Sequence, residues 1–168
     1  MLDLDAEAIY RQLARRAREH YGGKPLSLVG VHTGGVWLAE RLKRELSVAA
    51  PVGILDVSFY RDDFDQSGLK SAVRPSQITF DVAGSHILLV DDVLNTGRTV
   101  RAAMNEIFDY GRPAKIDLAV LVDRGGRDLP IAASIVGATI ELPASLSAVL
   151  TRDDDDRLHL TIEERGAD

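Results

Sequence analysis

The sequence predicts an α/β fold of the doubly wound type, built on a mainly parallel sheet. The first observation is a run of four apolar residues at 87–90, which is typical of a strand buried on both faces. The second is the polar loop that follows it, and the third is the helical spacing of apolar residues over 100–110. A similar order of strand, loop and helix occurs at 26–46. We therefore expect one doubly wound domain spanning residues 1–168.

The first predicted helix covers residues 5–21, with Asp5 as its cap. Its inward face consists of apolar residues at helical spacing, namely Ala6, Ile9, Leu13, Ala14 and Ala17. Arg11, Arg15 and Arg18 lie on a different stripe of the same helix. Two interpretations of this stripe remain open: a solvated face whose cations pair with nearby acids, or a surface that contacts RNA phosphates.

A short strand is predicted at 26–31, followed by a glycine-bearing loop at 32–35 and a helix that ends at Leu46. The N–H groups at the start of a helix lack helical partners and attract anions, and glycine lets a ligand approach them closely. This loop is therefore a candidate anion site. The alternative is a plain tight turn.

The next strand is predicted at 52–60, and a further one at 77–80. Between them lies a polar stretch without a clear period, which includes Arg61. A long loop inside a compact domain is usually functional or disordered, so we expect a flexible loop here. An exposed hairpin is the alternative.

The strand at 87–90 ends in Asp91 and Asp92. Two carboxylates at the end of a buried strand are costly unless they face a crevice. The loop that follows leads into a helix N-terminus. Thr96 and Thr99 provide hydroxyls there, Gly97 lets a ligand approach the backbone, and Arg98 provides a cation. Because carboxylates suit ribose hydroxyls or hydrated magnesium, a sugar phosphate would satisfy both ends. The alternative is an ordinary strand–loop–helix with a capping Thr.

The last part of the chain begins with a parallel-type strand at 115–122, and polar residues 123–128 follow its carboxyl end, where doubly wound sheets bind ligands. Later strands are predicted near 134–137, 148–152 and 158–162. The acidic run 153–156 indicates a solvated hairpin turn, and a metal site is the less favoured alternative.

Composition narrows the function classes. With 20 Lys and Arg against 26 Asp and Glu, the formal net charge is -6, which argues against a surface that coats nucleic acid. The chain has no cysteine, no apolar run of bilayer length and an acidic start, so we expect a cytoplasmic protein without membrane partners. The sequence contains neither a Walker A pattern nor a Gly-x-Gly-x-x-Gly motif.

The stretch from Asp91 to Thr99 resembles the binding signature of type I phosphoribosyltransferases, which bind phosphoribosyl pyrophosphate (PRPP). Further motifs resemble one family of these, the bifunctional pyrimidine-operon attenuation regulators and uracil phosphoribosyltransferases. The motifs span nearly the whole chain and are Thr33–Gly35, Tyr60–Asp63, Gly111–Ala114, Leu121–Gly125, Leu129–Ile131 and Val136–Gly137.

The resemblance implies a type I phosphoribosyltransferase fold with a flexible loop and added antiparallel strands. It implies an enzyme that makes UMP and pyrophosphate from uracil and PRPP with Mg²⁺. It also implies binding of pyrimidine-operon leader RNA in response to UMP or UTP, which causes transcription attenuation. We expect a homodimer or a higher homo-oligomer.

Roles follow from the same resemblance. Asp91 and Asp92 would hold the ribose hydroxyls and the magnesium ion, directly or through water. The 5′-phosphate would lie on Thr96, Gly97, Arg98 and Thr99, and pyrophosphate on Thr33, Gly34 and Gly35 with help from Arg61. The uracil edge would lie near Val122, Asp123 and Arg124. At Asn95, in the same substrate loop, several purine-using relatives carry an acid. The amide leaves the proton acceptor for uracil unassigned and makes purines less suitable.

Departures from the family bear on RNA binding. Many members carry cations or His where this chain has Gly34, Gly126, Ala132 and Ala138. Because RNA binding depends on cations that neutralise phosphates, these losses should weaken it, although Arg11 and Arg15 still match family cations. The enzyme is therefore favoured over two alternatives: an RNA-binding regulator with little or no catalysis, and a phosphoribosyltransferase for another base.

Overall fold

Five parallel strands form the central sheet of the structure, a computed structural model that describes residues 2–57 and 76–166. Their order across the sheet is β3-β2-β4-β5-β6. The strands are β2 (Ser27–Val31), β3 (Gly53–Leu55), β4 (His86–Leu94), β5 (Lys115–Asp123) and β6 (Ile135–Thr139). β4 and β5 are almost wholly buried because helices cover both faces of the sheet.

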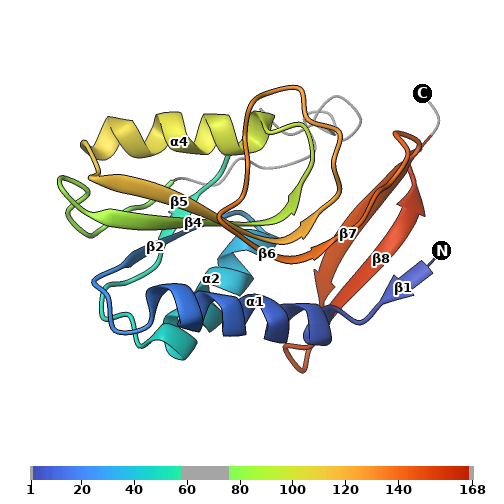
Figure 1. The fold of residues 1–168 in the computed structure, drawn as a ribbon, viewed down its shortest axis with the longest axis horizontal. Helices are drawn as coiled ribbons and strands as arrows, with labels where there is room; N and C mark the ends of the chain where they lie inside the picture. The colour runs from blue at the N-terminus through green and yellow to red at the C-terminus, as the bar shows by residue number, and fades with distance from the viewer. Residues whose placement is uncertain (1, 58–75, 167–168) are drawn as a thin grey trace.

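The helices divide between the two faces of this sheet (Figure 1). α1 (Ala6–Tyr21) and α2 (Gly34–Leu46) cover one face, and α4 (Arg98–Tyr110) covers the other. Each face has its own apolar core, one centred on residues such as Leu13, Leu42 and Leu121, and one that includes Ile107 beneath α4. The doubly wound prediction is confirmed. Asp5 also caps α1 as predicted, since its Oδ1 accepts from the Ala8 N–H at 3.0 Å.

The direction of winding reverses beside β2. From β2 the chain passes through α2 to β3 on one side, and β4 then pairs with the other side of β2. The loops that leave β2 and β4 therefore diverge to opposite faces at the carboxyl ends of the strands. In open α/β sheets, ligands bind in the crevice at such a point.

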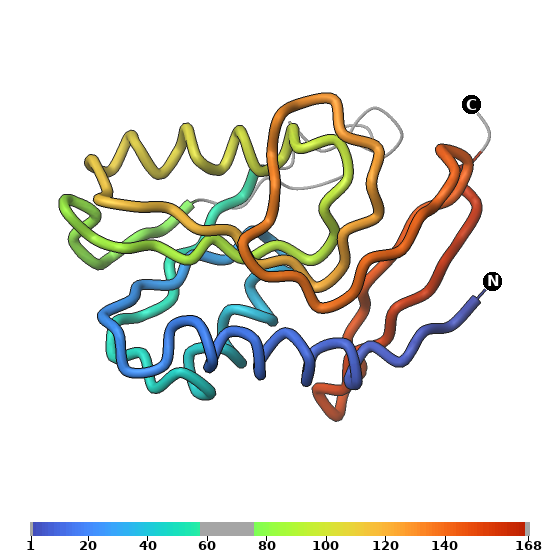
Figure 2. The backbone as a smooth tube through the Cα atoms, in the orientation of Figure 1, coloured from blue at the N-terminus to red at the C-terminus, as the bar shows by residue number. Residues whose placement is uncertain are grey.

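A second, smaller sheet is antiparallel and has the order β1-β8-β7, from β1 (Leu2–Leu4), β7 (Leu146–Arg152) and β8 (Leu158–Glu164). This small sheet lies beyond the carboxyl ends of the central strands, with both ends of the chain beside it (Figures 1 and 2). The added antiparallel strands are thus confirmed, and β1 is an addition that the sequence pattern did not predict. The acidic run 153–156 lies in the β7–β8 turn, as predicted.

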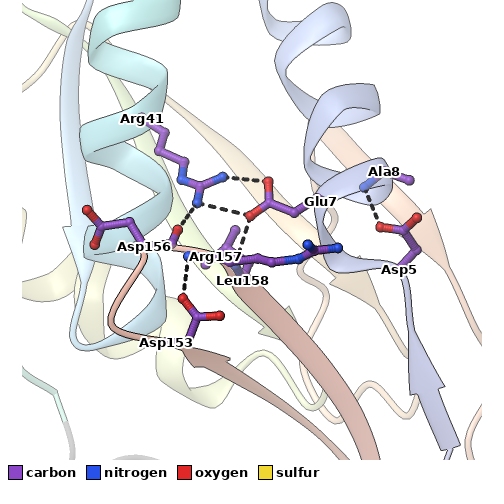
Figure 3. A network of polar contacts seen from close by, with 8 residues as sticks. All are labelled: Asp5, Glu7, Ala8, Arg41, Asp153, Asp156, Arg157 and Leu158. Atoms are coloured by element: carbon purple, nitrogen blue, oxygen red, sulfur yellow. Dashed lines mark hydrogen bonds and ion pairs between the residues drawn. The ribbon is translucent and has the colours of Figure 1, made fainter.

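A polar network joins the small sheet to two helices (Figure 3). Arg41 of α2 donates to both carboxylate oxygens of Glu7 at 2.8 and 3.1 Å, and to the carbonyl of Asp156. Glu7 also accepts from the Leu158 N–H at 2.8 Å. The start of α1, the middle of α2 and the β7–β8 turn are therefore fixed to one another.

The predicted strand at 77–80 is wrong. Only Gln77 pairs, through a single antiparallel bridge to Ile54 of β3, with both N···O distances at 2.7 Å. The apolar residues that suggested a strand, Ile78 and Phe80, instead pack against the core beneath α4. The predicted strand at 52–60 is observed as the shorter β3, and its last three residues lie outside the described residues.

Candidate functional site

A cleft of about 200 Å³ lies at the carboxyl ends of β2, β4 and β5, where the winding direction reverses. The small sheet forms its opposite wall, through β7 and the residue that follows β8. The lining residues are Val31, His32, Asp91, Asp92, Val93, Asn95, Thr99, Arg124, Ser147, Ala148, Val149, Leu150 and Arg165. Four of the predicted site residues with acidic or polar side chains, Asp91, Asp92, Asn95 and Thr99, therefore line one cavity.

Asp91 and Asp92 lie within β4, which continues four residues beyond the predicted apolar run, as far as Leu94. Asp91 is only 5% exposed, and its Oδ1 accepts from the Asp92 N–H at 2.8 Å. The Oδ1 of Asp92 accepts from the Val93 N–H, also at 2.8 Å. Each carboxylate thus has one oxygen held by backbone at the cleft wall, which orients the group.

The β4–α4 loop, residues 95–97, leads directly into the N-terminus of α4. Gly97 has φ +94°, a conformation that other residues adopt only with strain. The Thr96 hydroxyl accepts from the Arg98 N–H at 3.2 Å, and the Thr96 carbonyl accepts from the Asp128 N–H at 3.0 Å. The loop is thus shaped by its own Thr and braced by residues after β5, which Figure 2 shows arching beside it.

The β2–α2 loop holds the second predicted anion site. A cis peptide bond joins His32 to Thr33, and α2 begins at Gly34. A methyl group on Gly34 would lie 2.5 Å from Asp92 Oδ2, and one on Gly35 would collide with the Val90 carbonyl. Gly35 is therefore needed for α2 to start directly against the β4 backbone, whereas a side chain at Gly34 would require the Asp92 side chain to move.

The residues assigned to the uracil edge have three different environments. Val122 is fully buried in the core, so its side chain does not face the cleft. Asp123 forms an ion pair with Arg127 at 2.6 Å and accepts from the Gly125 N–H at 3.0 Å. Burial raises the pKa of Asp123, but these two contacts outweigh it and the net pKa is lowered. Asp123 is therefore a carboxylate at neutral pH.

Arg124 is 5% exposed and lines the cleft. Its guanidinium donates to the carbonyls of Leu142, Pro143 and Leu146 at 3.2, 3.0 and 2.6 Å. These bonds attach the end of β5 to the segment that leads into β7. Arg124 thus positions the small sheet over the cleft.

Sequence reasoning missed Arg165 and Ser147, which line the cleft from the small sheet. The guanidinium of Arg165 donates to the Asn95 side-chain oxygen at 3.0 Å, with the amide orientation assigned from its hydrogen bonds. The 69 positions between Asn95 and Arg165 carry no local pattern that would have predicted this contact. Arg61 lies outside the described residues. Arg11 and Arg15 are exposed on α1, and neither lines the cleft.

The fold and the cleft define a phosphoribosyltransferase: the chain belongs to the phosphoribosyl transferase domain family, whose model matches residues 3–153. Within it, the chain belongs to the bifunctional PyrR proteins. It is 51% identical over 159 residues to Bifunctional protein PyrR of Nitrosococcus oceani, covering 91% of this chain and 89% of that protein. It is 59% identical over 114 residues to Bifunctional protein PyrR of Pseudomonas aeruginosa, covering 68% and 67%. The resemblance found in the motifs is thereby confirmed.

Solved structures agree on the fold. A hypoxanthine phosphoribosyltransferase from Trypanosoma cruzi, in a ternary complex with substrates, is 26% identical with a TM-score of 0.67. The match covers 97% of this chain and 94% of that one. The type I phosphoribosyltransferase fold, with its parallel sheet and added antiparallel strands, is therefore shown.

Proposed function

We propose that this chain is a uracil phosphoribosyltransferase that makes UMP and pyrophosphate from uracil and PRPP. One observation carries the proposal: two carboxylates and two helix N-termini meet at one cleft where the winding of the sheet reverses. PRPP carries phosphate groups at two ends of a ribose. A ligand with two anionic ends and hydroxyls between them matches this arrangement.

In this proposal each helix start receives one phosphate group. The 5′-phosphate lies on the β4–α4 loop and the N-terminus of α4, where Thr96 and Thr99 add hydroxyls and Arg98 adds a cation. Arg98 is exposed and lies 3.4 Å from Asp128, so its side chain can turn to an anion at little cost. Pyrophosphate lies at the start of α2, on Thr33, Gly34 and Gly35, with Arg61 as an additional cation.

Asp91 and Asp92 fit a magnesium ion that is shared with PRPP. Mg²⁺ in proteins is usually bound by one or two carboxylates together with substrate oxygens and waters. The part of the chain that the structure describes has no group of three or more metal-binding side chains, which suits this shared mode rather than an all-protein cage. When bound, the ion would neutralise the charge of the pyrophosphate group.

The reaction joins N1 of uracil to C1′ of the ribose while the bond from C1′ to the pyrophosphate oxygen breaks, and the N1 proton is released. Positive charge develops on the ribose in the transition state. Asp91 and Asp92, held at the cleft wall, are placed to stabilise that charge. Asn95 is an amide and cannot take the N1 proton, so the chain supplies binding, orientation and electrostatics there rather than a base.

The test is UMP formation from PRPP and labelled uracil with Mg²⁺, run beside orotate, hypoxanthine and guanine. Activity confined to uracil supports the proposal. Activity with another base would identify a phosphoribosyltransferase of different specificity. No activity in a protein that still binds UMP would indicate a regulator that uses the fold as a nucleotide sensor.

The proposal extends to regulation, with pyrimidine-operon leader RNA as partner and UMP or UTP as signals. The observation that favours it is the exposed position of Arg11 and Arg15 on α1. A homodimer or higher homo-oligomer, a single domain over 1–168 and a cytoplasmic location complete the proposal. Within residues 2–57 and 76–166, no helix is long and apolar enough to cross a membrane.

A further inference from the structure

Arg165 directly follows β8 and lines the cleft from the small sheet. Its backbone N–H donates to the Ser145 carbonyl at 2.8 Å, and its Nε donates to the Ser147 hydroxyl at 2.9 Å. These two bonds fix the base of the side chain. The guanidinium then extends to Asn95 in the β4–α4 loop. Arg165 is therefore the link between the wall formed by the small sheet and the loop proposed to hold the 5′-phosphate.

Asn95 is held at its other end as well. Its amide nitrogen donates to the Gly125 carbonyl at 3.0 Å. A methyl group on Gly126 would lie 2.8 Å from the Asn95 side chain, so the absence of a side chain at Gly126 leaves space for the Asn95 amide. Arg165, Asn95 and Gly125 thus form a continuous chain of hydrogen bonds along one end of the cleft, which we call the Arg165 bridge.

The Arg165 bridge lies at the end of the cleft that is left for the base of the substrate. With the phosphates at the starts of α2 and α4 and the ribose at the two acids, the base is left with the end of the cleft beside β5 and the small sheet. That end is lined by Arg124, just after β5, and by Arg165. A guanidinium has five N–H donors and no acceptor, and the contacts described for Arg165 use two of them.

We propose that Arg165 is a specificity-determining residue of the base site, which rests on the proposed function. Its guanidinium donates to a carbonyl oxygen of the base and also fixes the Asn95 amide. The cleft therefore takes a pyrimidine with carbonyl groups and rejects one that presents an amino group, since two donors would face each other. The cation also stabilises the negative charge that builds up on the base oxygens as N1 loses its proton.

The test compares Arg165→Ala and Arg165→Lys with Arg152→Ala. Arg152 is a suitable control because it belongs to the same hairpin, where its guanidinium lies over the Trp37 ring at 4.8 Å and does not line the cleft. We expect Arg165→Ala to raise the KM for uracil about 10- to 100-fold and the KM for PRPP much less. Arg165→Lys should restore part of the loss, because it keeps the charge without the fork. Arg152→Ala should leave both KM values unchanged.

A double variant separates contact with the base from contact with Asn95. If Arg165 acts on the base partly through Asn95, the effects of Asn95→Ala and Arg165→Ala on the KM for uracil are less than additive. Melting temperatures of all variants identify any that fail to fold. The proposal is overturned by a KM for uracil that stays at the wild-type value in Arg165→Ala, or by equal rises in the KM for uracil and for PRPP.

If the wild-type protein forms no UMP, the proposed function is rejected. The role of Arg165 is then tested separately by ligand binding. Calorimetry would compare UMP with ribose 5-phosphate. Weaker binding of UMP alone in Arg165→Ala supports the role of Arg165. Unchanged UMP binding in that variant, or a wild type that does not bind UMP, rejects it.

Discussion

Asp91 and Asp92 are neighbours in the chain, yet the fold places them differently. Asp91 lies in register with Val120 of β5 and is buried, whereas Asp92 is half-buried and leans over the start of α2 at Gly34. Moving a carboxylate out of water costs hydration free energy, so this pair is retained at the expense of stability. That cost is what we expect of residues that act on a ligand.

Changing either acid to Asn should remove most magnesium-dependent turnover of PRPP, by about 100-fold or more, because the charge that stabilises the ribose is lost. The shape of the side chain is kept, so the fold should remain intact. UMP formation and circular dichroism melting measure the two effects. Asp109→Asn, on the exposed surface of α4, is the control that should leave turnover unchanged. Wild-type turnover in Asp91→Asn or Asp92→Asn would remove these carboxylates from the mechanism.

Gly97 combines a positive φ with a close contact. Its φ is +94°, and a methyl group there would lie 2.9 Å from Ile131 Cγ1. Gly97→Ala should therefore weaken PRPP binding about tenfold as well as destabilise the fold by about 1–2 kcal/mol. Gly23→Ala is a matched control, since Gly23 has φ +77° with nothing within 4 Å. Isothermal titration with PRPP should show a loss in the first variant only, and equal losses would contradict the assigned role of the β4–α4 loop.

The start of α1, α2 and the β7–β8 turn meet at Glu7, so elements distant in sequence depend on one carboxylate. The hydrogen bonds from Arg41 lower the pKa of Glu7 below its ordinary value of 4.5, against the opposing effect of burial. A lowered pKa in the folded state means that the charged form stabilises the fold above pH 4.5. That contribution is lost as the pH falls below 4.5 through the folded pKa.

Glu7→Gln should consequently destabilise the protein at pH 7 by about 1–3 kcal/mol, and much less at pH 3. Urea unfolding at the two pH values measures this difference. Glu19→Gln provides the comparison, because Glu19 pairs with Arg15 at 4.0 Å with both side chains more than half exposed. It should change stability little at either pH. A loss for Glu7→Gln that is equal at both pH values would show that the ion pair is not its origin.

At the scale of the whole molecule, the net charge and the number of basic side chains determine how tightly RNA can bind. The net charge of -6 repels a polyanion, and this chain has Gly34, Gly126, Ala132 and Ala138 where the family resemblance leads us to expect Arg, His, Arg and Lys. We expect gel-shift assays with a pyrimidine leader hairpin to show weak binding that falls by tenfold or more between 50 and 200 mM salt. Arg11→Ala with Arg15→Ala should weaken it further. Tight binding that requires UMP and persists in high salt would reverse the ranking of enzyme over regulator.

Much of the candidate site is predictable from the sequence. Asp91, Asp92 and the β4–α4 loop are predictable because the buried strand, the acids and the helix start are contiguous in the chain. Arg165 was not found, because its contact with Asn95 depends on where the small sheet lies. The family resemblance predicts Val122 near the base, and strand alternation turns its side chain into the core.

What the sequence alone determined is the local order of the fold. Apolar runs specified the buried strands, periodic spacing specified α1, α2 and α4, and glycines and acids specified the candidate loops, since each depends on neighbouring residues only. The tertiary structure alone decided three things: the strand order β3-β2-β4-β5-β6, the placing of the small sheet over the cleft, and the Arg165 bridge. These depend on contacts between distant segments, which packing selects and which no local pattern encodes.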